Sequence, residues 1–368
     1  MFLGFTLLSR YKNNCNRLCI KTGIPVEKFY ERMNLTERIE AFGRLGDWIR
    51  NLDAETMEEL TQAARNENPW FVETEVVRAL HGIGHFLNRE ELTNWTNRYH
   101  FSNPSKRVGV AMAGNIPLVG FHDLLCVVLS GHTLVAKLSS QDTVLLRRLV
   151  RELVRMEPKM DSCIFFSEHL KNVDAVIATG SDNTSRYFEY YFRKIPHIIR
   201  KNRSSCAILT GDEPVEELAK LGEDVFSYFG LGCRNVSKLF VPEKYSFTPL
   251  LDSWSSYAFV SNHHKYHNNY EYHKSILLVN QQPHLDTGFL LLREEKALVS
   301  PIAVLFYETY SSQKDLRSKL GEIQEKIQCR VSAAGWWNGS LAFGQAQSPQ
   351  VDDYPDQVDT LQFLMSIT

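Results

Sequence analysis

Short apolar segments alternate with segments of helical spacing from residue 107 onward, and this alternation constrains the fold more than any other feature. The apolar runs at 107–112 and 133–137 have the length of buried strands, and 118–129 and 143–156 have the length of helices. Strands that alternate with helices form parallel sheets whose faces the helices cover. The sequence therefore predicts an α/β fold.

A second α/β region follows the first, and 368 residues are enough for several domains. Residues 26–97 have helical spacing and many charges, which predicts a helical N-terminal region. We further predict a helix at 215–229 and strands at 173–179, 206–209, 238–242, 276–279 and 302–306. The predicted parts of the chain are a helical region 1–104, a first α/β domain 105–205, a second 206–335 and a C-terminal returning segment 336–368.

Charge and cysteine content exclude several classes of protein. The chain has 41 Lys and Arg against 43 Asp and Glu, so no net field favours nucleic acid or an anionic membrane. Seven cysteines without a Cys-x-x-Cys pair fit a reducing compartment better than secretion. The apolar segments at 1–8 and 119–136 resemble neither a signal peptide nor a membrane span. We expect a cytoplasmic protein.

Polar residues follow three predicted strands, at the edge where parallel sheets bind ligands. Asn115 follows the first strand, and its side-chain NH₂ could donate to a developing oxyanion. Lys137 ends the second, and Thr179, Gly180 and Ser181 end the third, where a helix start favours anions. The alternatives are a helix cap for Asn115 and for 179–181, and a solvated surface lysine for Lys137.

Cys233 lies on a glycine-rich turn, Phe-Gly-Leu-Gly-Cys-Arg-Asn-Val at 229–236. Glycine lets the backbone approach a ligand closely, and a thiolate held there is a nucleophile for acyl chemistry. The alternative is a buried thiol, because free cysteine is among the most buried residue types.

These motifs together resemble the aldehyde dehydrogenase superfamily. Its asparagine turn, ribose-contacting lysine stretch, phosphate turn and cysteine turn are similar here to Gly-Asn-Ile-Pro at 114–117, Lys-Leu-Ser-Ser at 137–140, Thr-Gly-Ser at 179–181 and Gly-Leu-Gly-Cys at 230–233. The segments 203–213, 267–272 and 343–349 resemble its acyl-CoA reductase branch, the relatives of the LuxC fatty-acid reductase of luminous bacteria.

The resemblance implies a Rossmann-type cofactor domain at 105–205 and a catalytic domain at 206–335, with the helical region packing on the cofactor domain. Cys233 would accept the acyl group, and Asn115 would stabilise the oxyanion. Lys137, Ser139 and Ser140 would contact the adenosine ribose, and the turn 179–181 the cofactor phosphates. The product would be a fatty aldehyde. The resemblance further implies a homo-oligomer, an acyl-CoA or acyl-protein substrate, and synthetase and acyltransferase partners.

Three departures from the superfamily refine this expectation. Oxidising relatives carry a water-activating glutamate where this chain has 199–204, a stretch without a carboxylate. The lack of this glutamate favours thioester reduction over aldehyde oxidation, because no base there activates water to hydrolyse the acyl-enzyme. Ser140 replaces a glutamate that repels a 2′-phosphate, and Lys137, Arg147 and Arg148 are nearby, so we expect NADPH, with NADH as the alternative. Ala297 replaces the glutamate that holds the nicotinamide ribose.

Other functions remain open at this point. An oxidising aldehyde dehydrogenase, a non-redox acyltransferase and an acyl-binding protein with a decayed cofactor site could each use the same cysteine turn. Four histidines at 263, 264, 267 and 273 lack the cysteine or acidic partners of a zinc site, so we expect no metal.

Overall fold

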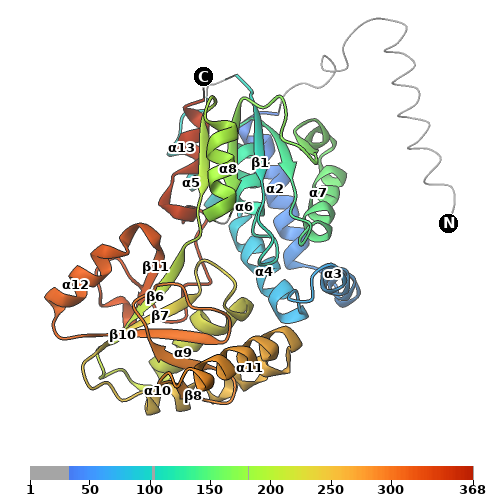
Figure 1. Ribbon diagram of the computed structural model, residues 1–368. Coiled ribbons are helices and arrows are strands. Elements are labelled where there is room, and N and C mark those ends of the chain that lie inside the picture. Colours follow the sequence, from blue (N-terminus) through green and yellow to red (C-terminus); the bar gives the residue numbers. More distant parts are fainter. Residues whose placement is uncertain (1–32, 102–103, 181, 368) are drawn as a thin grey trace, which may run out of the picture.

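The computed structural model describes residues 33–101, 104–180 and 182–367, which form two α/β units built on separate sheets (Figure 1). The first sheet has five strands, all parallel, in the order β3-β2-β1-β4-β5. Its strands are β1 (Arg107–Ala111), β2 (Thr133–Lys137), β3 (Ile164–Phe166), β4 (Ala175–Thr179) and β5 (His197–Arg200).

The strand order creates a crevice beside β1. From β1 the chain proceeds through α6 (Phe121–Leu129) to β2 and through α7 (Val144–Met156) towards β3, and then returns to the other side of β1 as β4. Connections from the ends of β1 and β4 therefore leave in opposite directions. Open α/β sheets bind their ligands at such a switch point, beyond the carboxyl ends of the strands.

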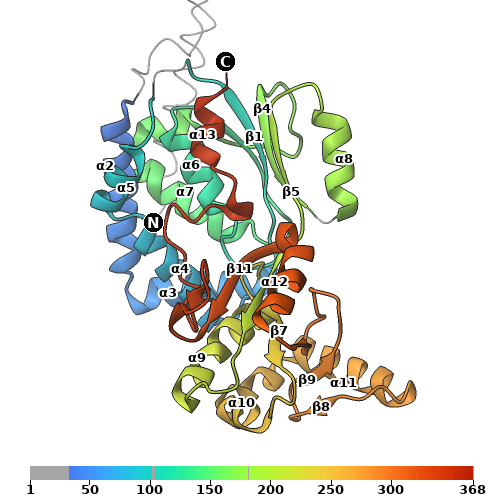
Figure 2. The ribbon, with the colours of Figure 1, turned by 90° about the vertical axis from the view of Figure 1, so that its left-hand side faces the viewer.

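The N-terminal helices and the C-terminus cover one face of this sheet, and α8 (Asp182–Phe192) covers the other (Figure 2). A single hydrophobic core lies between these helices and the face of the sheet that they cover. In this core Phe42 packs edge-on against Phe121, at 6.5 Å between ring centroids. The C-terminal helix packs against α6. The helices on this face, besides α6 and α7, are α2 (Leu35–Arg50), α3 (Ala54–Glu67), α4 (Glu73–Phe86), α5 (Arg89–Thr96) and α13 (Thr360–Met365).

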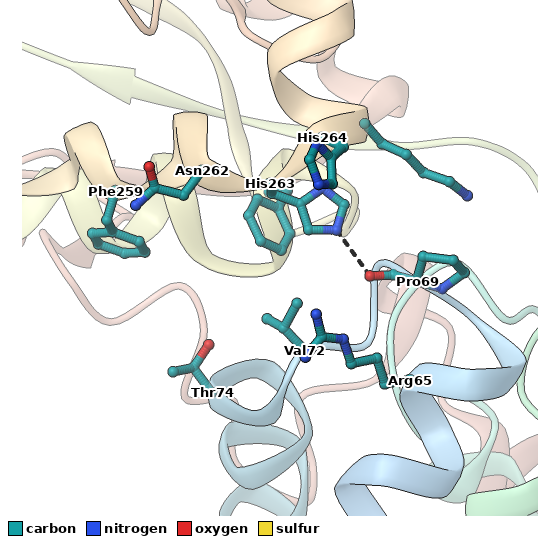
Figure 3. Close-up of a pocket in the computed structure, with 10 residues that line it drawn as sticks. Arg65, Pro69, Val72, Thr74, Phe259, Asn262, His263 and His264 are labelled. Carbon is teal, nitrogen blue, oxygen red and sulfur yellow. Dashed lines mark hydrogen bonds between the residues drawn. The ribbon is translucent and has the colours of Figure 1, made fainter.

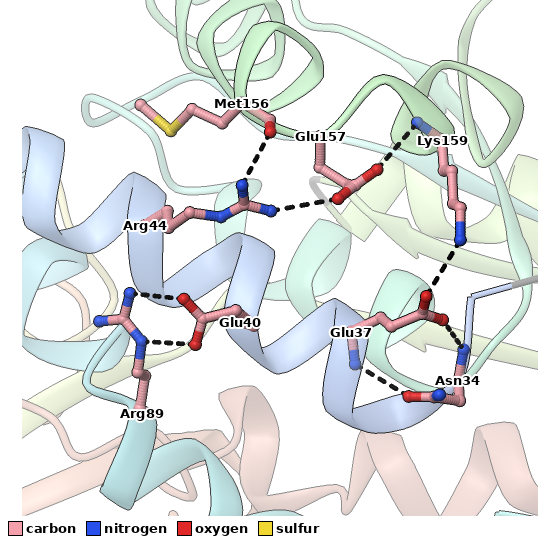
Figure 4. Close-up of polar contacts among 8 residues, drawn as sticks. All are labelled: Asn34, Glu37, Glu40, Arg44, Arg89, Met156, Glu157 and Lys159. Carbon is pink, nitrogen blue, oxygen red and sulfur yellow. Dashed lines mark hydrogen bonds and ion pairs between the residues drawn. The ribbon is translucent and has the colours of Figure 1, made fainter.

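Polar contacts at the start of α2 fix it to the sheet's helical layer (Figure 4). Asn34 and Glu37 form a capping box, in which each side chain accepts a hydrogen bond from the other residue's backbone N–H. Lys159 is 3.0 Å from the same Glu37 carboxylate, and Arg44 pairs with Glu157 at 3.1 Å. The helical region is thereby tied to the segment that follows α7.

The second sheet has seven strands in the order β12-β11-β6-β7-β10-β9-β8, and only β8 and β9 pair antiparallel. The chain enters it from the first sheet through residues 201–203. Its strands are β6 (Ser204–Ile208), β7 (Val236–Pro242), β8 (Leu285–Asp286), β9 (Leu291–Glu294), β10 (Val304–Tyr310), β11 (Ile327–Ser332) and β12 (Leu341–Ala342). Its α-helices are α9 (Val215–Phe226), α10 (Thr248–Ser253), α11 (His264–Val279) and α12 (Gln313–Glu322). Within the described part of the chain, no helix has the length and apolarity that a membrane span requires.

Three predicted elements differ from those observed, and six strands, β3, β5, β8, β9, β11 and β12, were not predicted. The predicted strand 276–279 is wrong, because these residues form the last turn of α11. Leu277 continues the buried face of Tyr266 and Tyr270, while the other apolar residues of the run are exposed. The predicted helix 118–129 begins only at Phe121, and the predicted helix 215–229 ends at Phe226. Both shortened ends belong to the loops of the candidate site.

Candidate active site

The turn that carries Cys233 has an unusual backbone. After α9, three successive residues adopt left-handed conformations: Tyr228 with φ 50°, Phe229 with φ 55° and Gly230 with φ 78°. Only glycine adopts this region freely, and each non-glycine residue there costs on the order of 1–3 kcal/mol. The surrounding contacts must therefore hold the turn in place. Cys233 follows it, exposed to solvent, just before β7.

The buried amide of Asn235 fastens the turn from within. Its side-chain oxygen accepts a hydrogen bond from the backbone N–H of Gly232 at 2.8 Å. Its side-chain nitrogen donates to the carbonyls of Ser227 at 2.8 Å and Asp224 at 3.1 Å. Only 2% of Asn235 is exposed, so these backbone groups have no ready access to water. One side chain thus joins the end of α9 to the turn beside the cysteine.

A carboxylate from the N-terminal helices supports the same turn from outside. The buried Glu75 of α4 accepts a hydrogen bond from the backbone N–H of the left-handed Tyr228 at 2.9 Å. Burial raises the pKa of Glu75, although this hydrogen bond and the adjacent Arg78 lower it. Arg78 also pairs with Glu223 of α9. The cysteine turn is therefore fixed against two parts of the chain.

Asn115 reaches the cysteine turn from the other sheet. Its side-chain nitrogen donates to the carbonyl of Leu231, at 2.7 Å. The alternative of a helix cap is wrong, because α6 begins at Phe121 with Gly120 at its N-cap. The amide has a second N–H, so it can hold the turn and also donate to a group at Cys233. The structure thus brings together the two residues proposed as catalytic.

The loop that carries Asn115 is itself held by a buried carboxylate. Leu118 has a left-handed φ of 59°, and its N–H donates to Asp142 at 2.7 Å. Burial raises the pKa of Asp142 to about 7. A Cβ atom at Gly114 would lie only 2.5 Å from the hydroxyl oxygen of Ser139, so the loops after β1 and β2 pack too closely for any other residue there.

The Cys233 thiol is accessible but poorly solvated. Protein atoms surround it on most sides, and this burial raises the pKa of Cys233 to about 11, although Arg234 lowers the pKa. Arg234 is fixed by donating to the carbonyl of Ala346 at 2.5 Å. The hydroxyl of Ser205 donates to the Cys233 carbonyl at 3.1 Å and lies 3.0 Å from the sulfur of Cys329.

The stretch where oxidising relatives carry a glutamate has a different role here. Arg200, at the end of β5, is buried and pairs with Asp123 at 2.5 Å. The carboxylate that influences Cys233 comes instead from the C-terminal segment. Asp356 raises the pKa of Cys233 and is paired with Arg203 at 3.3 Å. Sequence reasoning missed Asp356, because nothing in the local pattern around it indicates proximity to a cysteine more than one hundred residues earlier.

The residues proposed to bind the cofactor follow β2 and β4, at the same edge as Asn115. Lys137 is exposed and forms no ion pair with any residue that the structure describes. Ser139 and Ser140 follow it; across the switch point Thr179 ends β4 and Gly180 comes directly after it. Ser181 lies outside the described residues. A free ammonium group and a glycine at a switch-point crevice fit a nucleotide cofactor with its phosphates.

The histidines at 263, 264, 267 and 273 do not form a metal site: within the described ranges, no group of three or more His, Cys, Asp or Glu side chains could hold a metal ion. His263 instead stacks on Trp70, at 4.6 Å between ring centroids, and its Nε2 lies 2.8 Å from the carbonyl of Pro69. Phe229 of the cysteine turn packs on its other side.

Comparison with known proteins identifies the family. The family model described as "Acyl-CoA reductase (LuxC)" matches residues 44–242, over half of the chain. The chain belongs to the acyl-CoA reductase (LuxC) family. The match begins within α2 and spans the other N-terminal helices, the first sheet and the cysteine turn, ending with β7. A search of curated protein sequences found no match.

Solved structures of aldehyde dehydrogenases share the fold. An NAD⁺ complex of aldehyde dehydrogenase from Bacillus cereus has 14% sequence identity and a TM-score of 0.60, over 82% of this chain and 72% of that one. An NAD⁺ complex of an indole-3-acetaldehyde dehydrogenase has 12% identity and a TM-score of 0.62, over 86% and 74%. The aldehyde dehydrogenase KauB from Pseudomonas aeruginosa has 13% identity and a TM-score of 0.61, over 84% and 73%.

Family and fold agree on the general chemistry. The family description names reductases of acyl-CoA, which is a thioester, and two of the aldehyde dehydrogenases with a similar fold are complexes with NAD⁺. This member is accordingly an oxidoreductase of the acyl and aldehyde type, with an α/β fold of two sheets and a helical N-terminal region.

Proposed function

We propose that this protein is an NADPH-dependent acyl-thioester reductase that forms a fatty aldehyde through an acyl group on Cys233. The observation that carries the proposal is the hydrogen bond from Asn115 to the cysteine turn. This bond joins Asn115, from the loop after β1, to Leu231, two residues before the exposed Cys233, and Lys137 and Gly180 lie at the ends of the strands on either side of β1.

The first half-reaction needs only groups of the chain itself. The Cys233 thiolate attacks the thioester carbonyl, and the negative charge develops on the carbonyl oxygen. The free N–H of Asn115 and the backbone N–H of Cys233 would stabilise that oxygen. The tetrahedral intermediate then expels the carrier thiolate, which takes up a proton. The acyl group remains as a thioester on Cys233.

The cofactor would lie along the edge of the first sheet. Lys137, Ser139 and Ser140 would contact the adenosine ribose, and the turn 179–181 the phosphates. When bound, the reduced nicotinamide supplies the hydride that reduces the acyl group. The resulting thiohemiacetal on Cys233 collapses to the aldehyde and returns the sulfur to its thiolate form, so the cysteine is regenerated.

The charge of Lys137 supports NADPH. The contribution that the sequence predicts from Arg147 and Arg148 is smaller, because both side chains are engaged elsewhere. Arg148 pairs with Glu59 at 3.1 Å and Glu152 at 3.3 Å, and Arg147 packs over the ring of Phe166. Lys137 is therefore the cation that would contact a 2′-phosphate. We expect Lys137→Ala to raise KM for NADPH more than KM for NADH, and equal effects on both would contradict this role.

The residues near the thiol also favour reduction over hydrolysis. No carboxylate lies at 199–204, and Asp356 is engaged by Arg203. An acyl group on Cys233 would therefore persist until hydride arrives, since the stretch 199–204 supplies no water-activating base and the Asp356 carboxylate is held by Arg203. If Asp356 acted as such a base, the enzyme would release free fatty acid, and Asp356→Asn would abolish that release.

The decisive experiment is acylation followed by reduction. After incubation with a long-chain acyl-CoA, intact mass spectrometry should show one acyl group per chain, and peptide mapping should place it on Cys233. NADPH should then remove it with oxidation of one equivalent. Cys233→Ala should lose both signals, whereas the neighbouring Cys329→Ala should keep them. Acylation that survives in Cys233→Ala would refute the mechanism.

We further propose a cytoplasmic homo-oligomer that works with an acyl-protein synthetase or acyltransferase. Family resemblance and the balanced charge support this proposal. Light scattering of the purified protein tests the oligomeric state, and a monomer at micromolar concentration would contradict it.

A further inference from the structure

A buried carboxylate of α9 holds a turn of the segment 343–349, to which the proposed function gives no role. Asp224 accepts hydrogen bonds from the backbone N–H groups of Gly344 at 2.7 Å and Ala346 at 2.9 Å. Asp224 is fully buried and lies in the last turn of α9, just before the cysteine turn. One carboxylate thus connects the 344–346 turn to the helix that leads to the nucleophile.

The same turn fixes the guanidinium group of Arg234. The Nε–H of Arg234 donates to the carbonyl of Ala346 at 2.5 Å, whereas its ion pair with the exposed Asp353 is longer, at 3.8 Å. A carbonyl oxygen fixes a guanidinium group by a charge-assisted hydrogen bond and does not neutralise it. The arrangement therefore leaves the positive charge of Arg234 available next to Cys233.

Arg234 follows Cys233 directly and is the cation that acts most strongly on its thiol. Burial raises the pKa of Cys233, Arg234 lowers it, and Cys329 and Asp356 raise it further. A thiolate in poorly solvated surroundings needs a positive charge close to it. The position of the guanidinium group therefore controls how readily Cys233 becomes a nucleophile.

A guanidinium group released from the 344–346 turn has another place to go. Arg234 lines a cavity of about 370 Å³ whose wall also includes Asp353. In this cavity Arg234 could pair closely with Asp353, and a closer carboxylate would weaken the effect of the cation on the thiol. The bond to Ala346 prevents this movement, and that bond depends on where Asp224 holds the turn.

Other contacts hold the cysteine turn without the Asp224 carboxylate. Phe229 forms part of the wall of a cavity of about 400 Å³ between the α3–α4 junction and the start of α11 (Figure 3). Its ring packs on His263 at 4.6 Å between ring centroids, and Nε2 of His263 lies 2.8 Å from a carbonyl of the α3–α4 junction. Asn235 donates to the backbone carbonyl of Asp224, which a change of the carboxylate leaves in place. Loss of the carboxylate should therefore displace the 344–346 turn rather than the cysteine turn.

We propose that Asp224 is a positioning residue for the reaction at Cys233: through the 344–346 turn it holds the positive charge of Arg234 beside the thiol. The segment 343–349 then serves the nucleophile, although it lies far away in the sequence. The inference rests on the proposed function in taking Cys233 as the nucleophile, and it adds two residues that control the reactivity of the thiol.

Alkylation of Cys233 by iodoacetamide tests the inference without acyl-CoA. Peptide mapping follows the Cys233 adduct at about pH 8.5, where Asp224 is ionised because its pKa, raised by burial, is about 7. We expect Asp224→Asn to slow this alkylation about three- to tenfold, since the thiolate fraction falls about tenfold for each unit by which the pKa of Cys233 rises. Removing a negative charge near the thiol, or loosening the fold around it, would instead speed alkylation. A rate equal to or above that of the wild type, in a variant that circular dichroism shows to be folded, would overturn the proposal.

Two further variants test the route through Arg234. Arg234→Met removes the cation, keeps the stem of the side chain and should slow alkylation to a similar extent. The double variant with Asp224→Asn should be no slower than Arg234→Met alone, because Asp224 acts through Arg234. Additive losses, or normal alkylation of Arg234→Met, would reject this route.

Gly344→Ala displaces the same turn while it keeps Asp224. Gly344 has a φ of 80°, and a Cβ atom there would lie 3.3 Å from the carbonyl oxygen of Lys220. This variant should also slow alkylation, and a normal rate would contradict the role of the turn. Glu213→Gln is the matched control, because Glu213 likewise accepts backbone N–H bonds from a turn, but beyond the other end of β6. It should react like the wild type, and an equal loss there would reject a specific role for Asp224.

Acylation separates this inference from the proposed function. With a long-chain acyl-CoA, the acyl adduct on Cys233 should form more slowly in Asp224→Asn and in Arg234→Met, by a factor similar to that for alkylation. Acylation at the wild-type rate in both variants would reject only this inference. Slow alkylation of both variants, without any acylation of the wild type, would reject only the reductase mechanism.

Discussion

Replacing Asn235 by alanine should release the cysteine turn from its position. The amide makes four hydrogen bonds, at 2.8, 2.8, 3.1 and 3.5 Å, all to backbone groups, and the residue is only 2% exposed. Each backbone group left without a partner costs about 1–3 kcal/mol. Because some of them can regain water when the turn moves, we expect Asn235→Ala to lower the free energy of unfolding by about 4 kcal/mol. The strained residues Tyr228 and Phe229 would also relax towards ordinary conformations.

The displacement of the cysteine turn in Asn235→Ala should lower the rate of acylation as well as the stability of the fold. A nucleophile displaced by about 1 Å can lose on the order of 10²-fold in rate, so the acylation of Cys233 in Asn235→Ala should slow by that order. Urea denaturation followed by circular dichroism measures the first effect, and the time course of the acyl adduct measures the second. Asn51→Ala is the matched control, because Asn51 is exposed and makes one local side-chain hydrogen bond. If Asn235→Ala matched this control in both assays, Asn235 would not be what holds the turn.

Three further predictions concern the groups around the thiol. Asn115→Ala should slow acylation about 10²–10³-fold while lowering stability by only about 1 kcal/mol, since one exposed hydrogen bond is lost; equal acylation rates would remove Asn115 from the mechanism. With the pKa of Cys233 near 11, its alkylation by iodoacetamide should rise about tenfold per pH unit between pH 7 and 9, and a plateau in that range would contradict the electrostatic environment described. The folded chain holds the proton of Asp142 more tightly than the unfolded chain, so its stabilising contribution is present at low pH and is lost as pH rises through about 7. Asp142→Asn should therefore gain stability relative to wild type by about 1 kcal/mol per pH unit from pH 5 to 7, and parallel curves in urea denaturation would refute this.

The sequence predicted the first sheet well where strand and helix patterns were unambiguous. The runs at 107–112 and 133–137 are strands because their apolar residues must be buried on both faces of a parallel sheet. The run at 276–279 was mistaken for a strand because four apolar residues fit either period. Its identity as helix depends on the preceding turns of α11, where Tyr266 and Tyr270 face the core.

The hydrophobic pattern of the sequence did not predict the conformations of the loops. Leu118, Tyr228 and Phe229 adopt left-handed conformations that their side chains disfavour. Two of them, Leu118 and Tyr228, are stabilised by long-range hydrogen bonds that their backbone N–H groups donate to the carboxylates of Asp142 and Glu75. No local preference predicts such a backbone, since the energy that holds it comes from residues far away in the sequence.

The sequence by itself determined which groups are available: a cysteine after glycines, an asparagine after a strand, a lysine at the end of the next strand and no carboxylate at 199–204. It also determined the family, because these motifs occur in a fixed order along the chain. Only the tertiary structure decided that Asn115 donates to the cysteine turn and that Asp356 and Arg203 lie near Cys233 as an ion pair. It alone also formed a cavity between α3–α4 and α11. The physical reason is that strand periodicity is a local property, whereas the meeting of two sheets at one thiol depends on how both pack.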